Sequence, residues 1–179
     1  MDERKPRVLN AEALWSFALK VLSGRAHSIG ELREKLRRRA ERISDIDEIV
    51  QRLKELGYLD DQRFAESFAS ARLSNEGFGR GRVIQDLRQR RVAPALAEKT
   101  VGKVYEEVDD DALIEEWIRR KYRTAPREGI FQEEKDLAAA YRRLLRAGFR
   151  TGAIVGALKR FAKDPSLLDN FDPPEETLD

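Results

Sequence analysis

The stretch that decides the fold is HSIGELREKL, residues 27–36. The Ser28 hydroxyl can accept a hydrogen bond from the backbone amide of Glu31 while the Glu31 carboxylate reaches back to the backbone amide of Ser28. This reciprocal pair is the capping box that begins a helix. Leu32 and Leu36 follow at a spacing of four, which predicts that one face of the helix is buried.

The segments around this helix predict a three-helix unit over residues 11–59. Apolar residues in 11–22 recur at spacings of three and four, as in an amphipathic helix. Ser44 followed by Asp47 repeats the helix start signal, and Gly57 is suited to a left-handed helix stop. We therefore expect three short helices, preceded by an N-terminal arm over residues 1–10.

The same arrangement recurs over residues 60–108 and 109–163. Superposing Leu36, Leu87 and Leu145 keeps most apolar positions in register. A short unit that cannot bury its apolar face alone stacks on its neighbours. The predicted fold is therefore all-α, with three tandem three-helix repeats that form an elongated, curved, solenoid-like molecule. We expect an acidic, disordered tail over residues 164–179.

Composition narrows the classes of function. Charged residues make up 38% of the chain, cysteine is absent and the only histidine is His27. The chain thus lacks disulfides, thiolate metal sites and the histidines of most hydrolase sites. It also has no P-loop motif and no apolar stretch near the ~20 residues of a membrane span. We expect a cytoplasmic binding protein without catalytic residues, cofactor, metal or membrane contact, and a monomer.

Two acidic clusters, Asp60-Asp61 and Asp109-Asp110-Asp111, could in principle attract divalent metals. Each lies where a predicted helix begins, however, and aspartates at that position cap the helix and complement its dipole. Capping is the simpler interpretation of both clusters.

Arginine follows the superposed leucine in all three repeats, as Arg37, Arg88 and Arg146. Arg33 and Arg142 lie one turn earlier in the first and third repeats. If the middle helices lie side by side, these arginines line one edge that suits phosphates or carboxylates. The alternative is a set of ordinary solvated helix faces, since 35 of the 179 residues are Lys or Arg.

Four segments together resemble the RecX family of regulators of the RecA recombinase. They are HSIGELREKL (27–36), GYLDDQRFA (57–65), GFGRGRVIQDL (77–87) and RRLLRAGF (142–149). The matching positions, for which we expect structural roles, are Leu32, Leu36, Gly57, Tyr58, Leu59, Asp60, Asp61, Phe64, Ala65, Gly79 and Leu87. The chain departs from the family where it has Arg90-Arg91-Val92, because the family often has Lys-Gly-Ile there.

Within GYLDD, we expect Gly57 to end a helix and Tyr58 and Leu59 to pack between repeats. Asp60 or Asp61 should cap the next helix. The resemblance implies a protein that lies along the groove of the RecA–DNA filament and lowers its ATP hydrolysis and strand exchange. Two alternatives are a direct binder of single- or double-stranded DNA with helix-turn-helix-like repeats, and a general helical scaffold.

Overall fold

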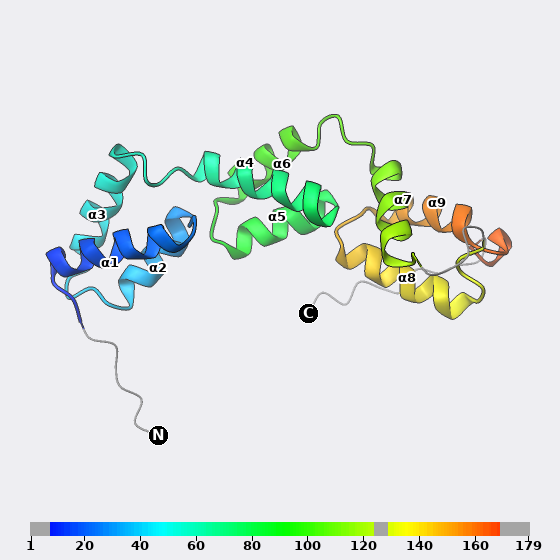
Figure 1. Ribbon diagram of the computed structural model, residues 1–179, viewed down its shortest axis with the longest axis horizontal. Coiled ribbons are helices and arrows are strands. Elements are labelled where there is room, and N and C mark those ends of the chain that lie inside the picture. The colour runs from blue at the N-terminus through cyan, green and yellow to red at the C-terminus, as the bar shows by residue number, and fades with distance from the viewer. Residues whose placement is uncertain (1–7, 124–128, 169–179) are drawn as a thin grey trace, which may run out of the picture. The chain divides into compact units, whose positions relative to one another are not determined.

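The computed structural model describes residues 8–123 and 129–168. Within these ranges the chain forms nine α-helices and no strand, so the predicted all-α fold is confirmed (Figure 1). The α-helices are α1 (Ala11–Gly24), α2 (Ile29–Arg37), α3 (Ser44–Glu55), α4 (Asp61–Ala71), α5 (Arg80–Gln89), α6 (Pro94–Val104), α7 (Asp110–Lys121), α8 (Glu134–Arg146) and α9 (Thr151–Phe161). A π-helix, η1 (Arg72–Glu76), continues α4, and a 3-10 helix, η2 (Pro165–Leu168), follows α9.

The described chain divides into two compact units. Unit 1 comprises residues up to 68 together with 86–100, and unit 2 comprises 69–85 together with the residues from 101 onward. The division passes through α4, α5 and α6, which make up the second predicted repeat. The repeat boundaries and the elongated, curved form remain predictions.

The core of unit 1 lies among α1, α2 and α3, with α2 in contact with both of the other helices. Leu32 and Leu36 are fully buried on the predicted face of α2. They belong to a cluster of Leu14, Ala18, Leu32, Leu36, Ile46, Ile49, Val50, Leu53 and Leu59. The period of the apolar residues thus places the inward face of each helix correctly.

The helix caps in unit 1 agree with the sequence at α2 and differ at α3. Ser28 accepts from the backbone amide of Glu31 at 3.0 Å, and the capping box is complete. In α3 the cap position is Ile43, whose side chain makes no capping bond. Helix α3 thus begins at Ser44, as predicted, but the predicted capping role of Ser44 is wrong, because Ser44 already lies inside the first turn.

The core of unit 2 is built around α9, which contacts α7, α8 and η2. Its largest buried side chains include Tyr141 of α8 and Phe131 of the preceding loop. We expected the disordered tail to begin at residue 164, but residues 165–168 form η2 because Leu168 is buried in this core. Residues 1–7 of the predicted arm and 169–179 of the predicted tail lie outside the described ranges.

Candidate partner-binding residues and the joints between middle helices

The five candidate arginines fall in both units. Arg33 and Arg37 lie on α2 and Arg88 on α5, all in unit 1, whereas Arg142 and Arg146 lie on α8 in unit 2. Their role in binding a partner stays a prediction, and the structure shows what surrounds each of them.

The register that equated Leu145 with Leu36 and Leu87 is wrong by one residue. Leu145 is only half-buried, whereas Leu144 is fully buried, as are Leu36 and Leu87. The ends of α5 and α8 agree with this correction, because the carbonyls of Leu87 and Leu144 each accept a bond from the amide five residues later, at 3.1 and 3.3 Å.

In the corrected register, the position after the core leucine holds Arg37, Arg88 and Leu145. Arg146 lies one residue further along α8, which is about 100° around the helix at 3.6 residues per turn. The apparent threefold repetition of arginine therefore does not survive the correction, and each arginine has to be judged by its own surroundings.

The three candidate arginines of unit 1 are held in ion pairs. Arg33 lies 2.6 Å from Asp47, Arg37 lies 3.4 Å from Glu34, and Arg88 pairs with Glu98. Their side chains are 40%, 60% and 50% exposed, respectively. Ion pairs this exposed contribute about 0–1 kcal/mol, so a partner's anion could displace the acid at little cost.

Arg142 and Arg146 are exposed on α8. In residues 8–123 and 129–168, no acid lies within ion-pair distance of either side chain. The neighbouring Arg143 differs, because its guanidinium donates to the Tyr122 hydroxyl at 3.2 Å and lies 5.9 Å from the centre of that ring. Arg142 and Arg146 are thus the candidates most available to an anionic partner.

The N-terminal end of α2 meets the C-terminal end of α5 in unit 1, and we call this contact the first joint. The buried Ser28 hydroxyl donates to the Arg90 carbonyl, and the Arg90 guanidinium lies 3.2 Å from the Glu31 carboxylate. Gly30 lies so close to Arg91 that a Cβ on it would be 2.5 Å from the Arg91 Cβ. Serine and glycine at these positions are therefore required by the contact.

Charge and burial act together on Glu31 at the first joint. Burial opposes ionisation of its carboxyl, but hydrogen bonds from Arg25 and from the Ser28 amide, with the charges of Arg25 and Arg90, hold its pKa below the usual value. The carboxylate pairs with Arg25 at 3.0 Å and with Arg90 at 3.2 Å. Glu31 therefore caps α2 and also ties it to the end of α5.

A second joint, inside unit 2, connects the N-terminal end of α5 to the C-terminal end of α8. The amides of Gly79 and Gly81 donate to the carbonyls of Ala147 and Gly148 at 2.8 and 3.1 Å. A Cβ on Gly79 would lie 2.8 Å from the Phe149 amide nitrogen and closer still to the Gly148 carbonyl. Glycine is needed at position 79 because the two backbones touch.

The two joints correct the premise that the middle helices lie side by side. In the first joint the side-chain hydroxyl of Ser28 at the start of α2 donates to the Arg90 carbonyl, whereas in the second joint backbone amides at the start of α5 donate to carbonyls at the end of α8. Each joint thus provides donors for carbonyls that a helix end leaves unpaired. The contacts thus run end to end, from α2 to α5 in unit 1 and from α5 to α8 in unit 2.

The GYLDD segment behaves largely as expected. Gly57 has a φ of 74° and ends α3, and Leu59 is 3% exposed. Asp60 caps α4 by accepting from the Arg63 amide at 3.0 Å. Tyr58, in contrast, is 57% exposed, so its predicted packing between repeats is wrong. The Tyr58 amide bonds to the Leu53 carbonyl in the helix stop, and the ring lies on the surface.

Asp61 has a role that the sequence did not reveal. Its carboxylate accepts from the Ile29 amide at 2.8 Å, so the start of α4 supplies an acceptor to the start of α2. Burial raises the pKa of Asp61 above its usual value, and the nearby charge of Asp60 raises it further. Three more motif residues are structural: Ala65 and Leu87 are buried, and Phe64 stacks on Phe68 with ring centres 6.1 Å apart.

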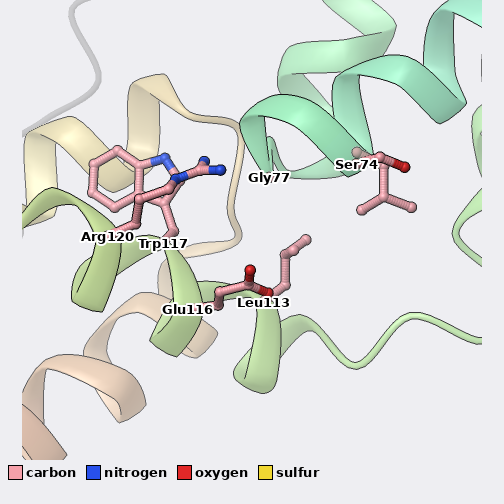
Figure 2. Close-up of a pocket in the computed structure, with 7 residues that line it drawn as sticks. Ser74, Gly77, Leu113, Glu116, Trp117 and Arg120 are labelled. Carbon is pink, nitrogen blue, oxygen red and sulfur yellow. The ribbon is translucent and has the colours of Figure 1, made fainter.

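A small pocket of about 210 Å³ lies between η1 and α7 in unit 2 (Figure 2). It is lined by Leu73, Ser74, Gly77, Leu113, Glu116, Trp117 and Arg120. The Arg120 guanidinium donates to the carbonyl of Asn75 at 3.1 Å and to that of Glu76, which satisfies the end of η1. Arg120 thus stabilises the π-helix and is not free to bind a ligand.

The acidic clusters cap helices, as predicted. Asp109 accepts from the amides of Asp111 and Ala112 at the start of α7. Across residues 8–123 and 129–168, no group of three or more His, Cys, Asp or Glu side chains is arranged to hold a metal ion. No helix in the same ranges is both long and apolar enough to span a membrane.

Comparison with known proteins identifies the family. A family model described as "RecX, first three-helix domain" matches residues 15–53, and "RecX, second three-helix domain" matches residues 60–101. "Regulatory protein RecX" of Deinococcus radiodurans is 32% identical over 163 residues, which cover 89% of this chain and 73% of the relative. The protein of the same name from Vibrio cholerae serotype O1 is 34% identical over 147 residues, covering 82% and 92%.

Two solved structures share the fold. The crystal structure of RecX from Lactobacillus salivarius matches with a TM-score of 0.64 and 19% identity, covering 84% of this chain and 96% of that one. A second crystal structure, of "regulatory protein RecX", matches with a TM-score of 0.61 and 18% identity, covering 83% and 73%. Sequence and fold agree, and this chain is a member of the RecX family of regulatory proteins.

Proposed function

We propose that this protein binds the RecA–DNA filament and lowers RecA ATPase, strand-exchange and coprotease activities in DNA repair, recombination and the SOS response. The observation that carries the proposal is the match to proteins named "Regulatory protein RecX" over most of the chain. We further propose that it acts as a monomer in the bacterial cytoplasm, without a catalytic step of its own.

The surroundings of the arginines support a binding mechanism. Arg142 and Arg146 offer exposed cations, and the ion pairs of Arg33, Arg37 and Arg88 are exposed enough to exchange partners. A chain that offers several such positions can contact more than one filament subunit, and linked contacts favour a polymer over free subunits. The filament's carboxylates and phosphates are the groups that arginine binds best.

RecA ATPase on single-stranded DNA, titrated with this protein, tests the proposal. We expect inhibition that needs RecA, DNA and nucleotide together. Arg142→Ala combined with Arg146→Ala should weaken the inhibition without loss of helix content. Lys20→Ala with Lys99→Ala is the matched control, since it removes two exposed charges from α1 and α6. An unchanged ATPase rate at every ratio would refute the proposed function, and equal inhibition by both double variants would refute the arginine assignment.

Direct binding to single- or double-stranded DNA is the second candidate, favoured by the exposed cations Lys121, Arg123, Arg142, Arg146 and Arg150 of unit 2. Salt dependence separates the two functions. Binding to duplex DNA alone should weaken with a slope of about −0.9 in log affinity against log salt per phosphate neutralised. Tight DNA binding without RecA, with no effect on its ATPase, would favour this candidate.

A further inference from the structure

One face of α8 presents cations that the described chain leaves without acids. Arg142 and Arg146 are four residues apart and so project from the same side of the helix. Both are exposed, and neither has an ion-pair partner among residues 8–123 and 129–168. We call these two side chains the α8 arginine pair.

The chain beyond Leu168 starts from a residue that is buried in the same core as α8. Leu168 is 4% exposed and belongs to the same buried cluster as Leu137, Tyr141 and Leu144 of α8. η2, which ends at Leu168, packs on α9. Residue 169 is therefore tethered to the three-helix unit that carries the α8 arginine pair.

The sequence after this anchor has the complementary charge. Residues 169–179 contain five acids and no Lys or Arg: Asp169, Asp172, Glu175, Glu176 and Asp179. Eleven residues reach up to about 36 Å when extended. α8 has 13 residues and is about 20 Å long. Any point on α8 is within reach of the segment, and such a short tether gives an effective concentration in the millimolar range.

We infer that the acidic segment 169–179 binds the α8 arginine pair of its own chain and competes there with external polyanions. The segment acts as a built-in competitor that lowers the affinity of this face at low salt. The competition weakens as salt shortens the range of the charge interaction, to about 3 Å at 1 M. The inference concerns self-regulation and does not depend on RecA being the partner.

Heparin serves as the polyanion in the test, in the absence of RecA. The tail variant carries Asp169→Asn, Asp172→Asn, Glu175→Gln, Glu176→Gln and Asp179→Asn in the full chain. The control carries five substitutions of exposed acids elsewhere, Glu12→Gln, Glu41→Gln, Glu48→Gln, Glu106→Gln and Glu107→Gln, which change the net charge equally. Both sets are also placed in a background of Arg142→Ala with Arg146→Ala.

We expect the tail variant to bind heparin about two- to tenfold more tightly than the control at low salt. In the control the acidic segment occupies the α8 arginine pair in many of the molecules, and the observed affinity falls in proportion to the fraction of molecules in which the pair is free. In the Arg142→Ala and Arg146→Ala background, the tail variant and the control should bind equally. An equal affinity of tail variant and control in the starting chain would overturn the inference. So would a tail effect that stays the same when both arginines are removed.

Discussion

The backbone amide of Gly79 donates a hydrogen bond of 2.8 Å to the backbone carbonyl of Ala147. This bond joins the start of α5 to the end of α8, helices that belong to two consecutive predicted repeats. Because the two backbones approach so closely, the second joint depends on the absence of a side chain at position 79.

Gly79→Ala should therefore destabilise the protein by about 1–3 kcal/mol, the range for forcing an extra carbon into a packed contact. Urea denaturation followed by circular dichroism measures the change. Gly102→Ala is the control, because it lies in α6 with no atom within 4 Å of the added Cβ. That substitution should stabilise the helix by about 0.5–1 kcal/mol. A Gly79→Ala protein as stable as the starting chain would show that the backbones can separate freely.

Ser28→Ala should lower stability through two lost bonds. The hydroxyl accepts from the Glu31 amide at 3.0 Å and donates to the Arg90 carbonyl. Loss of the cap costs about 0.5–2 kcal/mol, and the unsatisfied carbonyl adds to that cost. Ser44→Ala is the matched control, since the cap of α3 uses no side chain, and its effect should stay within about 0.5 kcal/mol. Equal losses in the two variants would contradict the assigned role of Ser28.

Asp61→Asn and Asp61→Ala should differ. Asparagine keeps an oxygen that can accept from the Ile29 amide, whereas alanine leaves this amide unpaired at a cost of about 1–3 kcal/mol. Burial raises the pKa of Asp61, so the ionised form of its carboxyl destabilises the folded state relative to the neutral form. We expect Asp61→Asn to be at least as stable as the starting chain at neutral pH, measured by urea denaturation. A loss as large as that of Asp61→Ala would mean that the negative charge is needed.

Acidification should destabilise the folded chain in two steps. Burial lowers the pKa of His27 below 6.5, so the unfolded chain binds the proton more readily and stability falls as pH drops through 6.5. The pKa of Glu31 lies below 4.5, so the stability that its ionised form contributes is lost at lower pH still. His27→Gln should flatten the first step and leave the second. Urea midpoints measured from about pH 8 down to about pH 2, at intervals of about one pH unit, follow both steps. A pH profile unchanged by the substitution would exclude His27 as the cause.

Local signals in the sequence were sufficient for many features. The capping box of Ser28 and Glu31, the stop at Gly57 and the buried faces of α2 and α5 depend on residues within two turns of each other. Helix caps, helix stops and buried helix faces of this kind can be predicted from the spacing of residues alone. The exposed Tyr58 shows the limit, because whether a neighbouring element covers a side chain is not encoded locally.

The register of the third repeat failed for a related reason. Leu144 and Leu145 are adjacent, and apolar spacing alone accommodates either one as the core position. The end of the helix decides between them, since Gly148 adopts a φ of 89° four residues after Leu144. In α5 the same position is Arg91, with a φ of 60°. An arginine there gives no sequence signal of a left-handed stop.

The joints themselves could not be predicted, because each depends on backbone atoms brought together from distant segments. Ser28 and Arg90 of the first joint are 62 residues apart, and Gly79 and Ala147 of the second joint belong to different predicted repeats. The α8 arginine pair was named from sequence, but the reason to single it out is the pattern of ion pairs around the other arginines.

The distance along the chain between Ser28 and Arg90 has a consequence for synthesis on the ribosome. The helices α1, α2 and α3 have their own buried cluster and can form as soon as residue 59 has emerged. The Arg90 carbonyl, which accepts from the Ser28 hydroxyl, emerges about 2–6 seconds later at synthesis rates of about 5–20 residues per second. We therefore expect the closing of the first joint to be a late step in the folding of unit 1, because the Arg90 carbonyl is available to Ser28 only after that interval.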